Sequence, residues 1–322
     1  MKNPFIKQVF DSSSTPSTVN SSLSTDSSSS LSTVYRPPFT RKLWTALPNF
    51  VDCAVFRPVA NLAEKQAIRQ SLGIPEAFFV VGCVAAVKKH HKRIDYLINE
   101  FASWTEVVDG RQLTVDGTLR AIDELSTVHR PPSTPFLLIA GAKTDETAEL
   151  LALAESLIPG RYKIMTDCSR AQMPNLLRSM DVFVLTSLFE MMPIALLEAL
   201  ASGLPCMVNQ HPVLEWMTGA GEKSIEQKET KERKGGGLGS AGGGCINSSL
   251  FPSFPSVQTS SAGGKAIDMS QEGALAAALA ALTPEWLVSH GGQARERAAK
   301  MFSKEVVIGL YLEYYQRVMS KE

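Results

Sequence analysis

Residues 181–205 read DVFVLTSLFEMMPIALLEALASGLP, and they hold the clearest strand and helix signals in the sequence. Its apolar run VFVL predicts a β-strand that is buried on both faces. A polar loop that carries Glu190 follows the strand. Pro193 is typical of a first helical residue, while Gly203 and Pro205 end the helix. The stretch therefore predicts a strand, a loop and a helix of about ten residues.

Apolar runs and helical periodicity alternate on both sides of this stretch. Continuous apolar strands separated by helices indicate a parallel sheet with helices on both faces. We therefore predict an α/β, Rossmann-like doubly wound parallel sheet, whose ligands bind beyond the carboxyl ends of the strands. The expected strands are 78–87, 136–140, 162–165, 182–185 and 205–208. The expected helices lie near 94–101, 119–125, 146–156, 170–178, 193–202, 271–282 and 291–319.

Two low-complexity stretches interrupt the chain. Residues 1–46 are rich in serine, and residues 222–263 pass from a charged run into a Gly-rich and Ser/Pro-rich tail. Such segments bury too little apolar surface to offset their ordering entropy. We expect a disordered segment 1–46 and one domain over 47–322, with a flexible insertion at 222–263.

Composition excludes several classes of function. The 32 Lys and Arg balance 32 Asp and Glu, so net charge favours neither nucleic acid nor an anionic membrane. The five cysteines show no CxxC pair, which disfavours a disulfide framework and a zinc site. No apolar run approaches the roughly 20 residues of a membrane span. We expect a cytoplasmic protein; the alternative is an organelle transit peptide, which Asp11 and Asp26 disfavour.

The helix that starts near Pro193 is a candidate anion site. Met192 precedes it, so no side chain caps the first turn and its N–H groups stay available to a phosphate. Glu198 lies on an otherwise apolar helix and needs a partner, such as the hydroxyls of a sugar ring. Glu190 is placed to meet the group beyond the phosphate. These features predict a ribonucleotide diphosphate bearing a sugar; the alternative is a helix cap at Glu190 and a surface carboxylate at Glu198.

A basic cluster, KKHHKR, occupies residues 88–93 directly after the first strand. Doubly wound sheets bind ligands at this position, so Lys88, Lys89, Lys92 and Arg93 are candidate phosphate contacts. A solvated basic loop is the alternative. No GxGxxG follows the strand, which disfavours a dinucleotide-dependent dehydrogenase.

Several segments resemble the donor-binding C-terminal domain of family 4 glycosyltransferases, or glycosyl transferases group 1. The seven-residue spacing between Glu190 and Glu198, followed by EALASGLP, is similar to the E-x7-E donor site of these retaining, GT-B enzymes. Four other segments are also similar to the family and occur along the chain in the family's order. They are PNFVD (48–52), HKRIDYLI (91–98), LLIAGA (137–142) and MFSKEVVIGLYLEYYQRV (301–318).

The resemblance implies a role for each matching residue. Glu190 would contact the transferred sugar and Lys92 the donor pyrophosphate, so both are candidate catalytic residues. Glu198 would bind the ribose hydroxyls. No metal or other cofactor is expected, because cationic side chains and helix dipoles stabilise the departing diphosphate. The remaining candidate donor-binding residues are Lys88, Lys89, Arg93, Gly82, Gly141, Met191, Met192, Pro193 and Ile194.

We therefore expect a retaining glycosyltransferase that transfers a hexose from a nucleotide-diphosphate sugar, with UDP favoured by family analogy. The sequence does not identify the acceptor, which could be a sugar, a lipid or a small molecule. In the family an acceptor-binding domain precedes the donor domain, whereas only residues 1–46 precede it here. The alternatives are a split enzyme, with the acceptor domain on a separate chain, and a non-catalytic sugar-nucleotide-binding or interaction module.

Overall fold

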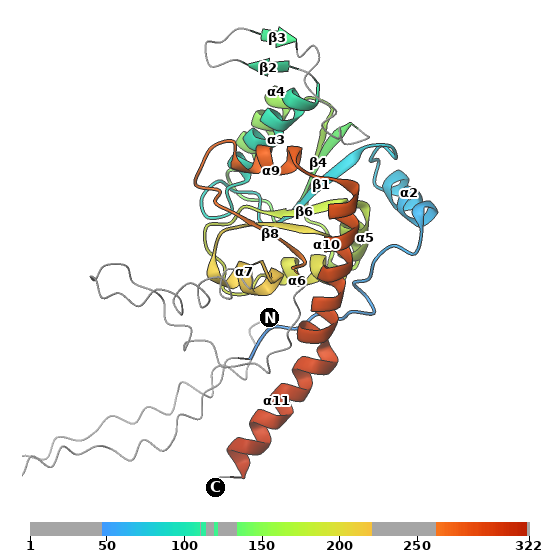
Figure 1. Cartoon of the computed structure of the whole chain (residues 1–322), viewed down its shortest axis with the longest axis vertical. Helices are drawn as coiled ribbons and strands as arrows, with labels where there is room; N and C mark the ends of the chain where they lie inside the picture. The colour runs from blue at the N-terminus through green and yellow to red at the C-terminus, as the bar shows by residue number, and fades with distance from the viewer. Residues whose placement is uncertain (1–46, 110, 114–118, 122–133, 221–261, 321–322) are drawn as a thin grey trace, which may run out of the picture. The chain divides into compact units, whose positions relative to one another are not determined.

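A six-stranded parallel sheet, in the order β5-β4-β1-β6-β7-β8, lies at the centre of the fold (Figure 1). The computed structural model describes residues 47–109, 111–113, 119–121, 134–220 and 262–320. The strands are β1 (Phe79–Val84), β4 (Pro135–Gly141), β5 (Tyr162–Thr166), β6 (Val182–Leu185), β7 (Cys206–Asn209) and β8 (Gly264–Ile267). The predicted doubly wound architecture is confirmed.

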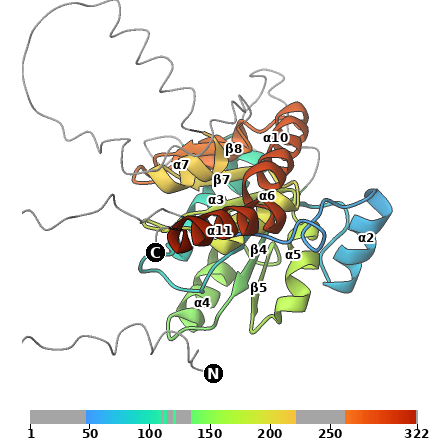
Figure 2. The ribbon, with the colours of Figure 1, turned by 90° about the horizontal axis from the view of Figure 1, so that it is seen from below.

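Helices cover both faces of the sheet, because side chains alternate between faces along each strand. Val81 and Cys83 of β1 pack into one core and Val80 into the other. The first core is closed by α3 (Ile94–Val108), α4 (Thr147–Leu157) and α9 (Ala274–Ala280). The second is closed by α5 (Met173–Ser179), α6 (Ile194–Ala201), α7 (Pro212–Thr218) and α10 (Pro284–Arg297). Figure 2 shows α2 (Leu62–Ser71) beside α5.

The direction of winding reverses between β1 and β6. The chain runs from β1 outward through β4 to β5, and then returns to β6 on the other side of β1. From β6 it runs outward again through β7 to β8. The loops after β1 and β6 (residues 85–93 and 186–193) therefore diverge at the sheet's carboxyl edge. In doubly wound folds this switch point holds the ligand.

The expected helix over 291–319 is broken in the structure. α10 ends at Arg297, a π-helical turn spans Ala298–Phe302, and α11 runs over Lys304–Met319. Ser303 caps the start of α11, since its side chain accepts from the Val306 N–H. Val51 pairs with the backbone at the break: its N–H donates to the Phe302 carbonyl at 2.8 Å and its carbonyl accepts from the Lys304 N–H at 3.0 Å. The opening segment (residues 47–56) is thereby fixed to the end of the sheet domain.

Other expectations need correction or lie outside the described residues. The expected helix at 119–125 is wrong at Leu119–Ala121, which form β3 and pair antiparallel with β2 (Arg111–Leu113). The segment 1–46 and residues 222–261 lie outside the described residues. At the end of the expected insertion, the Gly263 N–H donates to the Thr218 carbonyl at 2.8 Å. In the part of the chain that the structure describes, no helix is long and apolar enough to cross a bilayer.

Candidate donor site at the switch point

The loops that follow β1 and β6 are joined by hydrogen bonds at the switch point. Thr186 Oγ1 donates to the Lys92 carbonyl at 2.7 Å, and the Leu188 N–H donates to the His91 carbonyl at 2.9 Å. His91 and Arg93, on either side of Lys92, both have positive φ (72° and 53°). Such backbone is uncommon outside glycine, and it makes the tight turn at Lys92.

Lys92 and Glu190 form an ion pair between these two loops. Their side chains are 19% and 11% exposed, so both charges are largely shielded from water. Removing either partner of a shielded pair is costly, because it leaves the other charge uncompensated. The structure thus brings together the two residues predicted to act on the sugar and the diphosphate.

The start of α6 lies next to this pair in sequence, and no side chain caps it, as predicted; the predicted position of Pro193 is wrong by one residue, because Pro193 is the N-cap and not the first helical residue. Pro193 is the residue before the helix, and the helix begins at Ile194. The Pro193 carbonyl accepts from the N–H groups of Leu196 and Leu197. Within the described ranges, the N–H groups of Ile194 and Ala195 donate no hydrogen bond. Two donors at a helix N-terminus are therefore available to an anion.

The opening segment fixes the loop that leads into α6. Asn49 Nδ2 donates to the Met192 carbonyl at 3.1 Å, and the Asn49 N–H meets Met192 Sδ at 3.1 Å. Met191 beside it is 79% exposed. The loop's backbone path is thus held by a residue about 140 positions earlier, while the Met191 side chain faces solvent.

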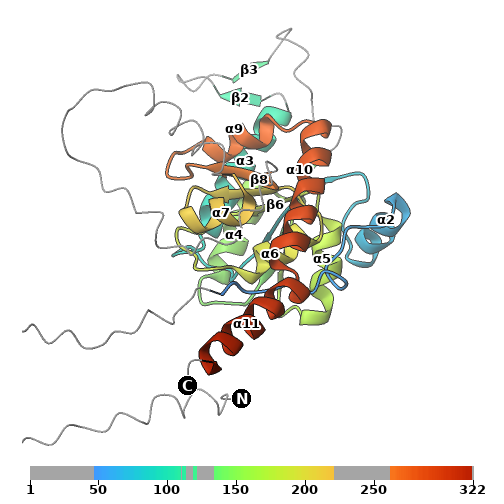
Figure 3. The ribbon, with the colours of Figure 1, turned by 60° about the horizontal axis from the view of Figure 1, so that its bottom comes forward.

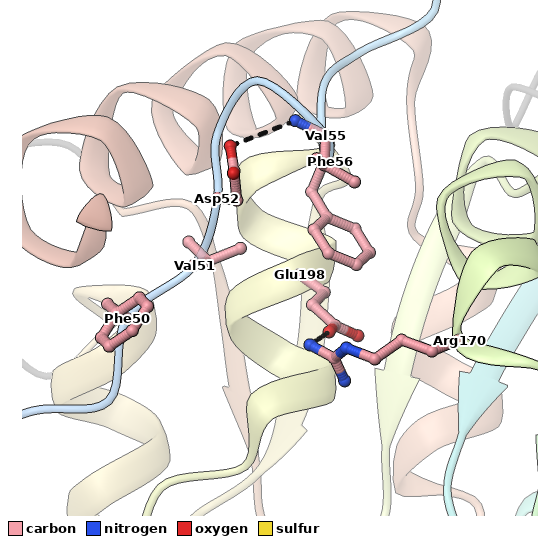
Figure 4. A pocket seen from close by; sticks show the side chains of 7 residues that line it. All are labelled: Phe50, Val51, Asp52, Val55, Phe56, Arg170 and Glu198. Carbon is pink, nitrogen blue, oxygen red and sulfur yellow. Dashed lines mark hydrogen bonds and ion pairs between the residues drawn. The ribbon is translucent and has the colours of Figure 1, made fainter. Parts of the chain in front are cut away.

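Glu198 is buried on the second turn of α6 and paired with Arg170. Its side chain is 4% exposed, and Glu198 Oε1 accepts from Arg170 Nη2 at 2.9 Å. Burial raises the pKa of the Glu198 carboxyl, and the Arg170 guanidinium opposes that rise. The two side chains line a pocket of about 210 Å³ with the opening segment (Figure 4). The other lining residues are Phe50, Val51, Asp52, Val55 and Phe56.

Sequence reasoning did not identify Arg170. It lies in a short 3₁₀ turn (Arg170–Gln172) that follows β5, whose carboxyl end shares the ligand-binding edge of the sheet. A basic residue shortly after a parallel strand was the available signal. The partner, Glu198, was identified.

The other three basic candidates differ in where their charges lie. The Lys89 ammonium pairs with Glu149 on α4 at 2.6 Å. The Arg93 guanidinium donates to the Met269 carbonyl at 2.6 Å and stacks over the Tyr96 ring at 4.0 Å. In this structure both cations are thus engaged by other groups of the chain. Among the described residues, the Lys88 ammonium forms no ion pair and no hydrogen bond.

At Gly82 and Gly141, close packing explains why the residue is glycine. Gly82 lies inside β1, where a Cβ would meet Met180 Sδ at 2.1 Å. Gly141 ends β4, where a Cβ would lie 1.7 Å from the Ala85 carbonyl oxygen. Close approach of the loop after β1 therefore requires a glycine at position 141. Gly82 lies away from the carboxyl edge and admits a methionine from the α5–β6 connection.

Several solved structures have folds similar to this one. Sucrose-phosphate synthase from Thermosynechococcus elongatus matches with a TM-score of 0.57 at 16% identity, over 86% of this chain and 53% of that one. Anabaena Alr3699/HepE, solved with UDP and glucose, matches with a TM-score of 0.54 at 15% identity, over 85% and 56%. The C-terminal domain of a group 1 glycosyl transferase family protein (LpcC) from Francisella tularensis matches at 0.50 and 15%, over 79% and 99%. These similarities establish a GT-B type of domain.

The family follows from the sequence match. Residues 64–231, just over half of the chain, match the family Glycosyl transferases group 1, and the chain belongs to this family. A UDP-Gal:α-D-GlcNAc-diphosphoundecaprenol α-1,3-galactosyltransferase of Escherichia coli is 58% identical over 40 residues, 12% of this chain and 10% of that protein. EpsF of Bacillus subtilis (strain 168), provisionally assigned as a glycosyltransferase, is 27% identical over 166 residues, 51% and 35%. The chain thus aligns with about a third or less of these curated relatives.

Proposed function

We propose that this chain binds the donor of a retaining GT-B glycosyltransferase that transfers a hexose from a UDP-linked sugar. The observation that carries the proposal is the shielded Lys92–Glu190 pair at the switch point. It lies where doubly wound sheets bind ligands, and the uncapped start of α6 follows Glu190 in the same loop. A positive charge, free N–H groups and two carboxylates suit a sugar joined to a diphosphate.

Each group of the donor has a proposed partner. The diphosphate would accept hydrogen bonds from the N–H groups of Ile194 and Ala195 and from the Lys92 ammonium. The ribose hydroxyls would donate to Glu198. The hexose hydroxyls would donate to Glu190. This carboxylate pairs with Lys92, which in this proposal binds the diphosphate next to the hexose.

The same groups would stabilise the transition state of sugar transfer. The bond that breaks joins the anomeric carbon to a diphosphate oxygen, and negative charge develops on that oxygen. Fixed donors in a site of low dielectric stabilise such charge strongly. In this proposal Lys92 and the start of α6 act in place of a metal ion. The acceptor oxygen bonds to the anomeric carbon on the face that the diphosphate leaves, which retains the configuration, and the acceptor's proton passes to the departing diphosphate oxygen.

Calorimetric titration with UDP, GDP and ADP tests donor binding. We expect UDP to bind to the purified chain with a dissociation constant on the order of 100 µM, and GDP and ADP more weakly. A preference for GDP or ADP would change the base but keep the site. Absence of binding heat for all three nucleotides would contradict the proposal.

A second candidate is a split enzyme or an interaction module, and α11 favours it. Figures 1 and 3 show α11 extending past the helices that cover the sheet. Ile308, Leu312, Tyr315 and Met319 are exposed at helical spacing, so they share one face of this helix. This face suits packing against a second domain, and the split enzyme is the case in which another chain supplies it. Sugar transfer catalysed by the purified single chain would exclude this candidate.

A further inference from the structure

The Arg170–Glu198 pair is an unequal one. The Glu198 side chain is 4% exposed, whereas that of Arg170 is 74% exposed. Arg170 binds only Oε1 of the carboxylate; among the described residues, Oε2 accepts no hydrogen bond. Figure 4 shows the Arg170 guanidinium beside the Glu198 carboxylate. One carboxylate oxygen is therefore occupied and the other is available to a ligand.

We propose that Arg170 is a positioning residue, whose guanidinium keeps the Glu198 carboxylate charged and turned so that Oε2 accepts the ribose hydroxyls. The inference rests on the proposed function and adds a residue to the same site. A charged carboxylate accepts hydroxyl hydrogen bonds more strongly than a neutral carboxyl does. A carboxyl buried on an apolar helix tends to be neutral, so it needs a cation to stay charged.

The other charged groups near α6 have partners of their own, so they do not stabilise the charge on Glu198. Asp52, which also lines the pocket, pairs with Lys304 of α11 at 2.6 Å. Arg295 of α10 donates to the Ala201 carbonyl at 2.6 Å and to the Phe56 carbonyl at 2.8 Å. Both groups are thus engaged elsewhere.

α5 also packs against α6, and its Arg178 is engaged as well. Arg178 pairs with Glu64 of α2 at 3.3 Å and donates to Asn175 Oδ1 at 2.6 Å. In the part of the chain that the structure describes, Arg170 is the only cation bound to Glu198. Burial raises the pKa of this carboxyl and Arg170 lowers it, in agreement with the geometry.

Positioning and direct contact with the nucleotide predict different pH dependences. If Arg170 only keeps Glu198 charged, removing Arg170 changes UDP affinity little at high pH, where the carboxyl ionises without help. The loss of affinity then grows as the pH falls. If Arg170 instead contacts the nucleotide, the loss of UDP affinity stays the same as the pH falls, or shrinks where the terminal phosphate of UDP gains a proton.

The test measures UDP affinity between about pH 5 and about pH 8, a range that brackets raised carboxyl pKa values. We expect Arg170→Ala to bind within about twofold of the natural chain at the upper end and about tenfold more weakly at the lower end. Arg170→Lys should restore most of the affinity, because it keeps a cation. Glu198→Gln should bind weakly at every pH. A pH-independent loss in Arg170→Ala, or no loss, would overturn the proposal.

Urea unfolding without nucleotide gives a second readout. A carboxyl with a raised folded-state pKa adds stability below its unfolded pKa, and that stability is lost as pH rises through the folded pKa. The contribution of Glu198 to the free energy of unfolding is the difference between a protein with Glu198 and the same protein with Glu198→Gln. In Arg170→Ala this contribution should be lost at higher pH than in the natural chain. If its pH dependence is the same with and without Arg170, the two groups are not coupled. If the natural chain binds no nucleotide, the proposed function fails; if it binds and only the pH pattern is missing, the positioning role alone fails.

Discussion

Replacing Lys92 with alanine is expected to weaken UDP binding about 100-fold, because a hydrogen bond from a shielded ammonium to a phosphate contributes about 2–3 kcal/mol. The Lys92 side chain is only 19% exposed, so water replaces it poorly. The variant also leaves the Glu190 carboxylate unpaired, where it would repel the diphosphate. Titration calorimetry of the folded variant measures the change.

Lys89→Ala is the matched control for this prediction. It removes the same charge from the same loop, but the Lys89 ammonium pairs with Glu149, whose side chain is 67% exposed. Such surface pairs contribute little, so UDP affinity should stay within about twofold. The double variant Lys92→Ala/Glu190→Gln should regain part of the loss, because the repulsion is removed. Equal losses in Lys92→Ala and Lys89→Ala would mean that only the total charge of the loop matters.

Local signals were sufficient to predict the strand–loop–helix unit. β6 forms at Val182–Leu185 as expected, because a short apolar run between Asp181 and Thr186 suits a strand that is buried on both faces. The start of α6 has no side-chain cap because Pro193, which has no side-chain acceptor, is its N-cap. Both features are decided within a few residues, so the sequence contains the whole cause.

Side-chain directions could not be predicted in the same way. Lys89 and Arg93 are engaged by Glu149 and Met269, which the chain supplies from other elements. At the break before α11 the backbone pairs with Val51, some 250 residues earlier. These outcomes depend on tertiary neighbours, and periodicity within one segment holds no information about them.

Gly141→Ala is expected to destabilise the fold by about 3 kcal/mol or more, because the new Cβ would lie 1.7 Å from the Ala85 carbonyl oxygen. Backbone cannot rotate away as a side chain can. The Ala85 N–H donates to the Ala140 carbonyl and the Val87 N–H to the Ala142 carbonyl, each at 3.0 Å. Relief of the clash must therefore break this pairing. A fall of about 10 °C in the melting temperature is expected.

Because the same pairing places the loop that carries Lys92, Gly141→Ala should also weaken UDP binding in the fraction that remains folded. Gly292→Ala is the control, since Gly292 is exposed inside α10 and a Cβ there would meet nothing within 4 Å. Alanine favours a helix over glycine by about 1 kcal/mol, so this variant should be slightly more stable with unchanged UDP affinity. A Gly141→Ala protein that melts within about 2 °C of the natural chain would show that the Ala85 backbone moves freely. In that result the loop after β1 would not be rigidly tied to β4, and the fixed position of Lys92 would need another cause.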